Sequence, residues 1–171
     1  FSGCSALSSV TIPNSVTSIW GGMFSGCNNL SAINVETLNS VYSSHEGVLL
    51  DKGRSTLIRC PAGKAGSYTI PASVTTIDDR AFSGCSSLTS VLIGDSVVRV
   101  GEWAFQGCSS LTSVTISASL TSVGYQAFLG CTGLTSVTLQ QGLTTIGAGM
   151  FSGCTGLTRV TIPDSVISMG E

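Results

Sequence analysis

The stretches Phe82-Ser-Gly-Cys85, Phe105-Gln-Gly-Cys108, Phe128-Leu-Gly-Cys131 and Phe151-Ser-Gly-Cys154 follow one another at a spacing of 23 residues. The same pattern opens the chain at Phe1 and returns at Phe24, again after 23 residues. A fixed period of this length is typical of a solenoid, in which each coil stacks only on its neighbours. The repeat therefore predicts one elongated stack of similar coils.

The unit that follows Cys108 shows what one coil contains. Apolar Leu111, Val114 and Ile116 alternate with serine and threonine, and this alternation of β-branched residues predicts a half-buried strand. The apolar pair Leu120 and Val123 predicts a second extended segment on another side of the coil. The closing Ala-Phe-x-Gly-Cys predicts a tight corner of about one 3₁₀ turn, in which the glycine takes a positive φ or allows a close approach of the backbone.

The period is interrupted between Phe24 and Phe82, which are 58 residues apart. There, the segments Val48-Leu-Leu-Asp51 and Thr56-Leu-Ile-Arg-Cys60 flank Lys52-Gly53-Arg54-Ser55, which predicts a β-hairpin with a four-residue loop. We expect an irregular coil over 46–66.

The whole chain is expected to be a single mainly β domain over 1–171, with regular repeats at 1–45 and 67–171. About eight coils, with strands ~4.8 Å apart, would build a parallel sheet roughly 35 Å long.

Composition excludes several classes of partner. The 171 residues carry a net charge of −2 with only 9% charged side chains, and the absence of a basic stripe argues against nucleic acid. No apolar run approaches the ~20 residues that a membrane span needs. A surface made polar by serine and threonine favours an extracellular protein. The chain starts at Phe1 without an initiator Met and stops within a repeat, so we expect a fragment of a longer protein.

Two motifs together resemble the BspA-like leucine-rich repeats: the Leu-x-x-Val-x-Ile core, as at 88–93, and the Ala-Phe-x-Gly-Cys corner. The stretch 46–64 also resembles an interruption common in that family. The resemblance implies a leucine-rich-repeat solenoid with a curved parallel sheet. It also implies a bacterial, or in some cases protozoan, surface protein that adheres to host matrix, host cells or other microbes. It carries no catalytic motif and no cofactor. Small departures are Asp78-Asp79 in place of Gly-x, and Met23 and Met150 in place of alanine.

Six of the seven cysteines share one phase of the repeat: Cys4, Cys27, Cys85, Cys108, Cys131 and Cys154. Stacked positions lie ~4.8 Å apart with parallel side chains, whereas a disulfide needs Cβ atoms about 3.8 Å apart that point at one another. We therefore expect a structural ladder of buried, reduced thiols that donate weakly to corner carbonyls, with a disulfide framework as the alternative. Cys60 is expected outside the column, buried in the hairpin. No histidine is interleaved and no C-x-x-C pair occurs, so no metal site is expected.

An enzyme is not expected. His45, Asp51 and Cys60 allow a Cys-His nucleophile, but a reactive cysteine needs an electropositive, partly exposed setting, and Cys60 falls on the inward face of its strand. The pair Asp78-Asp79 could contribute to a cation site. Calcium needs six to eight oxygen ligands, however, and a solvated turn is the simpler interpretation.

Two surfaces are candidates for binding. The concave face of the sheet should present Ser9, Thr11, Leu92, Ser113, Thr115, Ser136, Thr138, Arg159 and Thr161. A second candidate surface is formed by Lys52, Arg54, Arg59 and Lys64. Trp20, Trp103 and Tyr125 either contact ligand or pack over a neighbouring coil. The Ser-x-Thr rows also allow an ice-binding interpretation, but Leu92 and Arg159 break the array.

These observations favour a non-catalytic extracellular binding module of a bacterial surface protein. Its expected partner is a host or microbial surface protein or glycan. The alternative is a structural spacer that binds nothing. We expect no cofactor and no membrane insertion. Incomplete coils at both ends predict end-to-end self-association.

Overall fold

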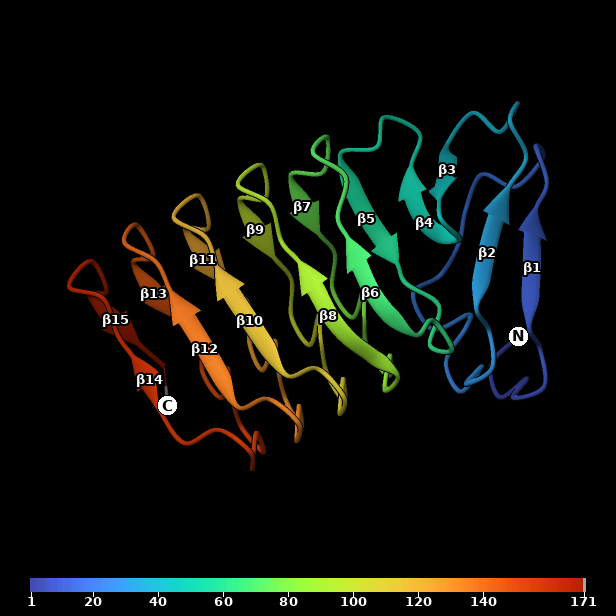
Figure 1. Ribbon diagram of the computed structural model, residues 1–171. Helices are drawn as coiled ribbons and strands as arrows, with labels where there is room; N and C mark the ends of the chain where they lie inside the picture. The colour runs from blue at the N-terminus through green and yellow to red at the C-terminus, as the bar shows by residue number, and fades with distance from the viewer. Residues whose placement is uncertain (171) are drawn as a thin grey trace.

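Each repeat folds into one coil that contributes a strand to a first row and, in most coils, a shorter strand to a second row (Figure 1). The computed structural model describes residues 1–170. The first row contains β1 (Ser9–Ile12), β2 (Ala32–Val35), β6 (Gly66–Thr69), β8 (Leu88–Leu92), β10 (Ser113–Ile116), β12 (Ser136–Leu139) and β14 (Val160–Thr161). The chain is thus an all-strand leucine-rich-repeat-type solenoid, as the repeat predicts.

The first row is parallel, and its register follows the repeat. Val114 of β10 lies opposite Val137 of β12, and Val10 of β1 lies opposite Ile33 of β2. Along β10 and β12 the valines point into the coil and the hydroxyl side chains point out, as the alternating pattern requires. Hydrogen bonding divides the row into the sheets β1-β2, β6-β8 and β10-β12-β14, so it is not one continuous sheet.

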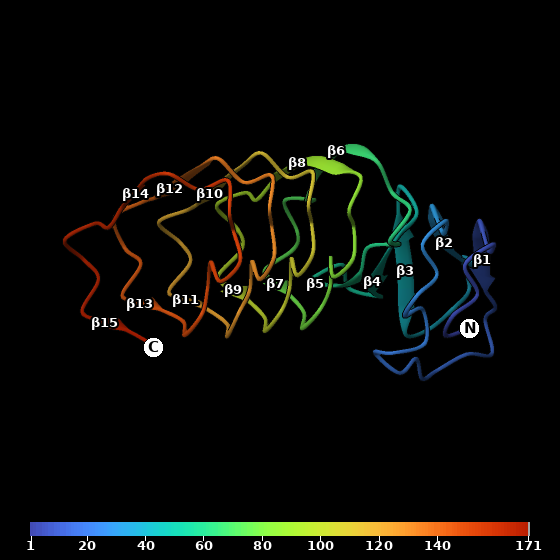
Figure 2. The ribbon, with the colours of Figure 1, turned by 90° about the horizontal axis from the view of Figure 1, so that it is seen from below.

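The second row forms the longest sheet. It contains β5 (Thr56–Arg59), β7 (Thr76–Ile77), β9 (Arg99–Val100), β11 (Ser122–Val123), β13 (Thr145–Ile146) and β15 (Ser168–Met169), all parallel. Figure 2 shows the two rows on opposite sides of the stack. The prediction of a second extended segment at Leu120 and Val123 is confirmed, since Val123 lies in β11. No helix of residues 1–170 could cross a membrane.

The predicted hairpin is present. Strand β4 (Val48–Asp51) pairs antiparallel with β5. The sequence did not predict β3 (Tyr42–His45), which pairs antiparallel with β4 and completes the eight-stranded sheet. Glu46 and Gly47 connect β3 to β4 with φ values of 49° and 77°, the positive values that a two-residue hairpin turn requires.

The corners hold the stack together through their phenylalanines. The Phe105 ring lies 4.7 Å from the Phe82 ring and 4.9 Å from the Phe128 ring, centroid to centroid, and all three side chains are buried. The prediction of a positive φ at the corner glycine is confirmed: the values run from 70° to 81° at Gly3, Gly26, Gly84, Gly107, Gly130 and Gly153.

The corners are separate turns and not 3₁₀ helices. In the corner around Phe82, the amides of Ser83 and Cys85 donate to the carbonyls of Arg80 and Phe82. Amides that donate at alternate residues make isolated turns, because a 3₁₀ helix needs such hydrogen bonds from consecutive residues. The left-handed conformation of Arg80, with a φ of 57°, prevents that continuation.

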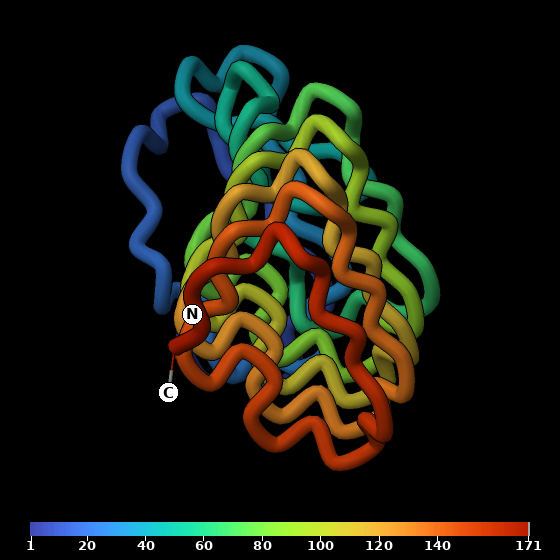
Figure 3. Tube along the Cα trace, turned by 90° about the vertical axis from the view of Figure 1, so that its left-hand side faces the viewer, coloured from blue at the N-terminus to red at the C-terminus, as the bar shows by residue number. Residues whose placement is uncertain are grey.

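Strand β4 separates two hydrophobic cores. Leu49 packs with Phe24, Ile33 and the other apolar residues of the first coils, whereas Val48 and Leu50 pack with the core of the later coils. All three β4 side chains are fully buried, because successive residues of a strand point to opposite faces. Viewed along the stack, the later coils superpose and part of the first coils, in blue, lies outside their outline (Figure 3).

Candidate binding surfaces and the cleft at the interrupted coil

The outward side chains of the first row form a surface that we call the strand face. Its members are all exposed: Ser9, Thr11, Leu92, Ser113, Thr115, Ser136, Thr138, Arg159 and Thr161. Thr115, Thr138 and Thr161 stand in register on neighbouring strands. Ser9 and Thr11 belong to the separate β1-β2 sheet and Leu92 to the β6-β8 sheet, so the sheet under this face is continuous only across β10, β12 and β14.

The four cations predicted as a second surface engage different neighbours. Lys52 and Arg54 line a shallow depression near Glu36 and Tyr42, and the Lys52 Nζ donates to the carbonyl of Thr37. The Lys64 Nζ donates to the carbonyl of Glu46 and lies 5.2 Å from the centre of the Tyr68 ring. Arg59 lines a cleft on another side of the hairpin. Of the four, Lys52 and Arg54 line one depression together.

The cysteines of the regular coils form a column. Three of the thiols donate to the corner phenylalanine carbonyl of the preceding coil, at 3.2 Å for Cys108, 3.1 Å for Cys131 and 3.1 Å for Cys154. The neighbouring thiol of Cys108, together with burial, raises the pKa of Cys131 to about 12. All seven cysteines are free thiols.

Two cysteines depart from the expected arrangement. Cys4 is exposed, because in the described structure no earlier coil covers the Phe1 corner. Cys60 is buried as expected but adjoins the column, since the thiol of Cys85 donates to the carbonyls of Cys60 and Pro61.

Cys60 lacks the setting of a nucleophile. Burial first, and then hydrogen bonding with Cys85, raises the pKa of the Cys60 thiol, so the thiolate is disfavoured. His45 pairs in the sheet with Val48. No group of three or more metal-binding side chains occurs among residues 1–170.

The aromatic residues before the corners divide between packing and exposure. Trp103 is half-buried between Arg80, whose guanidinium lies 4.2 Å from the ring centre, and the edge-on ring of Tyr125 at 5.4 Å. Its indole N–H donates to Gln126, so Trp103 ties neighbouring coils together. Trp20, in contrast, is 79% exposed.

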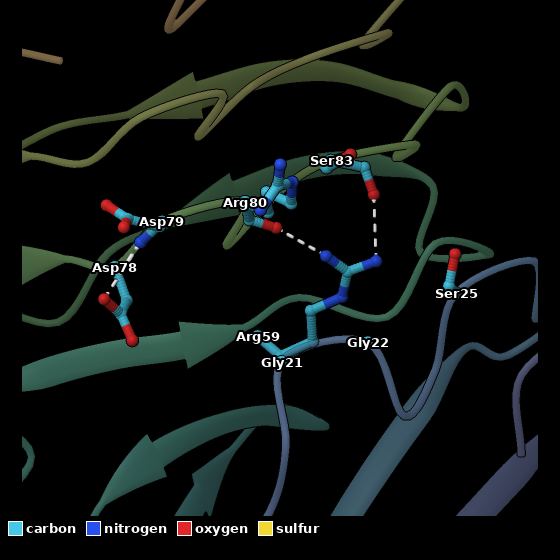
Figure 4. A pocket seen from close by; sticks show the side chains of 8 residues that line it. All are labelled: Gly21, Gly22, Ser25, Arg59, Asp78, Asp79, Arg80 and Ser83. Carbon is cyan, nitrogen blue, oxygen red and sulfur yellow. Dashed lines mark hydrogen bonds between the residues drawn. The ribbon is translucent and has the colours of Figure 1, made fainter. Parts of the chain in front are cut away.

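A cleft of about 460 Å³ opens where the repeat is interrupted (Figure 4), and we call it the interruption cleft. One wall comes from the corner of the first coils and the other from the hairpin and the next regular corner. The lining residues are Gly21, Gly22, Ser25, Arg59, Asp78, Asp79, Arg80 and Ser83. A smaller depression adjoins it, next to Trp20 and Phe24.

Asp78 and Asp79 were predicted as a solvated turn. The Asp78 carboxylate accepts from the Asp79 amide, and Asp79 pairs with Arg99 at 3.3 Å.

Arg59 takes the place of a missing corner at the far wall. Its guanidinium donates to the carbonyls of Arg80 and Ser83, and the Cys60 amide donates to the carbonyl of Ala81 at 2.7 Å. The Nε of Arg59 is buried and has no partner among residues 1–170. The sequence marked Arg59 only as one of four cations, because its role depends on the path of the irregular coil.

The sequence model of one protein family, the BspA type leucine rich repeat region, matches residues 1–46 and 62–171 of this chain in six copies. Comparison with curated protein sequences finds no match. Among solved structures, a leucine-rich repeat protein from Eubacterium ventriosum is 28% identical with a TM-score of 0.87, and the match covers 97% of this chain and 49% of that one.

Two further structures share the fold. A leucine rich cell surface protein from Faecalibacterium prausnitzii is 26% identical with a TM-score of 0.67, over 96% of this chain and 48% of that one. The pneumococcal vaccine antigen PcpA is 19% identical with a TM-score of 0.68, over 94% of this chain and 50% of that one, a likeness of fold alone. The chain spans about half the length of each of these proteins.

Proposed function

Because the chain belongs to the BspA-type leucine-rich-repeat family, we propose that it is a non-catalytic, extracellular binding module of a bacterial surface protein. In this proposal it adheres to a host or microbial surface protein or glycan through its strand face. The similarity to a cell surface protein of Faecalibacterium prausnitzii supports the location. Repeat solenoids commonly bind partners along such extended surfaces, which supports the role.

The observation that carries the proposal is the row of exposed hydroxyl groups in register on β10, β12 and β14. Neighbouring strands repeat these groups every ~4.8 Å, so an extended partner can meet the same donors and acceptors several times. The residues of the strand face include no Trp or Tyr, and their one Arg is Arg159 beside β14, so the face lacks most of the anchors of tight interfaces. We therefore propose weak binding per molecule, strengthened by many copies on one cell.

The test is the double substitution Thr115→Lys and Thr138→Lys, followed by a measurement of adhesion to immobilised matrix proteins and glycans. A matched control is Ser122→Lys with Thr145→Lys, because these exposed residues are paired neighbours on the second row. Loss of adhesion in the first variant, with retention in the control, is the expected result. Equal adhesion by both folded variants would remove the strand face from the proposal. An unmodified chain that binds nothing would favour a structural spacer.

A further inference from the structure

The regular corners are joined by a fixed set of backbone hydrogen bonds. In the corners of Phe82, Phe105 and Phe128, the amide of the phenylalanine and the amides two residues before and after it donate to carbonyls of the next corner. Trp103, Phe105 and Gly107, for example, donate to the carbonyls of Tyr125, Ala127 and Leu129 at 3.0, 2.7 and 2.8 Å. The same three bonds join the corner of Phe82 to that of Phe105, and the corner of Phe128 to that of Phe151.

The corner of Phe24 lacks this set. The equivalent amides belong to Gly22, Phe24 and Gly26, and none of them donates a hydrogen bond to any residue within 1–170. The next corner should supply the acceptors, but the irregular coil places Arg59 and Cys60 against the later coils instead. Gly22 lines the interruption cleft, and Phe24 lines the depression that adjoins it. Three donors at alternate residues are therefore left without an acceptor, and two of the three residues line the cleft or the depression beside it.

The opposite side of the cleft also has a hydrogen-bond donor without an acceptor. The buried Nε of Arg59 has no partner, and its guanidinium charge faces no carboxylate within 4 Å in the described chain. The ends of the cleft differ, because Asp78 and Asp79 lie at one end, whereas Ser25 and Ser83 lie at the other (Figure 4). An acidic side chain is favoured near Arg59 at the serine end, away from the two aspartates.

We propose that the interruption cleft binds an extended, acidic peptide segment of a partner protein. The carbonyls of alternate peptide residues accept from the amides of Gly22, Phe24 and Gly26, as the next corner does in the regular coils. A glutamate or aspartate side chain accepts from Arg59. The volume of about 460 Å³ falls within the range of about 300–1,000 Å³ that is typical of ligand-binding clefts. This site is separate from the strand face, so a test of the cleft does not depend on the result of the adhesion test.

The experiment follows the amide signals of Gly22, Phe24 and Gly26 by NMR during titration of the 171-residue chain. The probe is an acetylated, amidated hexapeptide of alternating glutamate and serine. The comparison probes are the same peptide with lysine in place of glutamate, and sodium acetate. We expect saturable shifts of the three amides with the glutamate peptide, and binding at least about tenfold weaker with the lysine peptide.

Two variants block the cleft. Ser25→Trp places a large side chain in it, and Gly22→Phe does so without a clash, because a Cβ at Gly22 meets nothing within 4 Å. The matched control is Ser152→Trp, an exposed serine at the same phase of the Phe151 corner. Both blocking variants should weaken binding at least about tenfold, as the loss of several hydrogen bonds implies, while the control binds normally.

Three results would overturn the proposal. The glutamate peptide could leave the amides of Gly22, Phe24 and Gly26 unshifted. Acetate could reproduce the shifts at the same concentration, which would make the cleft an anion site and not a peptide site. Hydrogen exchange at these three amides could be as slow as at Trp103, Phe105 and Gly107, which would mean that the donors are not open.

Discussion

The thiol of Cys131 donates a hydrogen bond to the backbone carbonyl of Phe105, 3.1 Å away and one coil earlier. The same carbonyl accepts from the amide of Cys108 at 3.2 Å, within its own corner. Both lone pairs of a buried oxygen are thereby used, one by the local turn and one by the next coil. Cysteine is small enough to be buried at this phase and still donates, which alanine cannot do.

Native thiol labelling should distinguish Cys4 from the other six cysteines. Cys4 is exposed, whereas Cys27, Cys60 and the rest of the column are buried. Titration with a thiol reagent such as dithionitrobenzoate should give one rapidly reacting group in native buffer and all seven in denaturant. The variant Cys4→Ser should abolish the rapid phase. Rapid labelling of Cys108 or Cys131 in the folded protein, or a cystine between them, would contradict the ladder.

Alkaline pH should destabilise the folded chain. The pKa of Cys131 rises from an ordinary value of 9.0 to about 12 on folding, because of the neighbouring Cys108 thiol and its burial. The unfolded thiol releases its proton first, so the stabilisation is complete below pH 9.0 and is lost as the pH rises toward 12. Denaturant unfolding at a series of pH values should show this decline. The decline should be shallower in Cys131→Ala, and an equal slope in both proteins would refute the assignment.

Phe105→Ala should lower the free energy of unfolding by roughly 3–5 kcal/mol, the range for a buried aromatic side chain. Phe105 is fully buried and its ring stacks on both neighbours, so the damage should reach the adjacent coils. Phe1 is the matched control, because it occupies the same phase but is 58% exposed and stacks on Phe24 alone. Phe1→Ala should lose much less stability. Thermal melts that are unchanged by Phe105→Ala would exclude the stacked corner.

Much of this architecture is readable from the sequence, because a repeated side chain has a repeated environment. The glycine before each corner, at Gly101 and Gly124, is one example. A Cβ at Gly124 would lie 2.6 Å from backbone atoms of the preceding coil, so only glycine fits there. Asp78 occupies the same position of its repeat, and the sequence shows only that it departs from the usual glycine there. The structure gives the reason: Asp78 borders the interruption cleft, where no regular coil presses against it.

The irregular coil was harder to predict, because its contacts are not periodic. Strand β3 has only one buried residue, Tyr42, and thus no alternating apolar signal. It is positioned by Asn39, which is fully buried and which the sequence did not single out. The Asn39 side chain donates to the carbonyls of Pro13 and Val16 and accepts from the amides of Val41 and Tyr42. One asparagine without a repeat partner gives no periodic signal.

Arg59 should matter for stability far more than Arg54, although both belong to the same hairpin. The guanidinium of Arg59 bonds to two corner carbonyls, whereas Arg54 is exposed and its side chain makes no hydrogen bond among residues 1–170. Arg59→Ala should lower the free energy of unfolding by roughly 2 kcal/mol, because two carbonyls lose a charged donor. Arg54→Ala should change it by less than about 0.5 kcal/mol. Equal effects in urea unfolding would show that Arg59 does not replace the missing corner.

When the 171-residue chain is studied by itself, the two ends of the stack should associate with each other in solution. At one end, Ile167 is 86% exposed and Met169 is 63% exposed, and β15 lies at the edge of its sheet. At the other end, Phe1 is 58% exposed and β1 lies at the edge of its own sheet. Exposed apolar side chains beside unpaired strand edges favour contact between copies of the chain. Sedimentation velocity should therefore show oligomers whose share rises with protein concentration.

Lysine substitutions test whether that contact is end to end. Ile167→Lys with Met169→Lys should abolish association, and Phe1→Lys alone should do the same, because a head-to-tail contact needs both ends. The control is Leu38→Lys, which adds the same charge at a residue that is 80% exposed in a turn away from both ends. This variant should associate like the unmodified chain. An unmodified chain that stays monomeric at high concentration would show that the ends do not attract each other. Loss of association in the Leu38 variant would place the contact elsewhere on the chain.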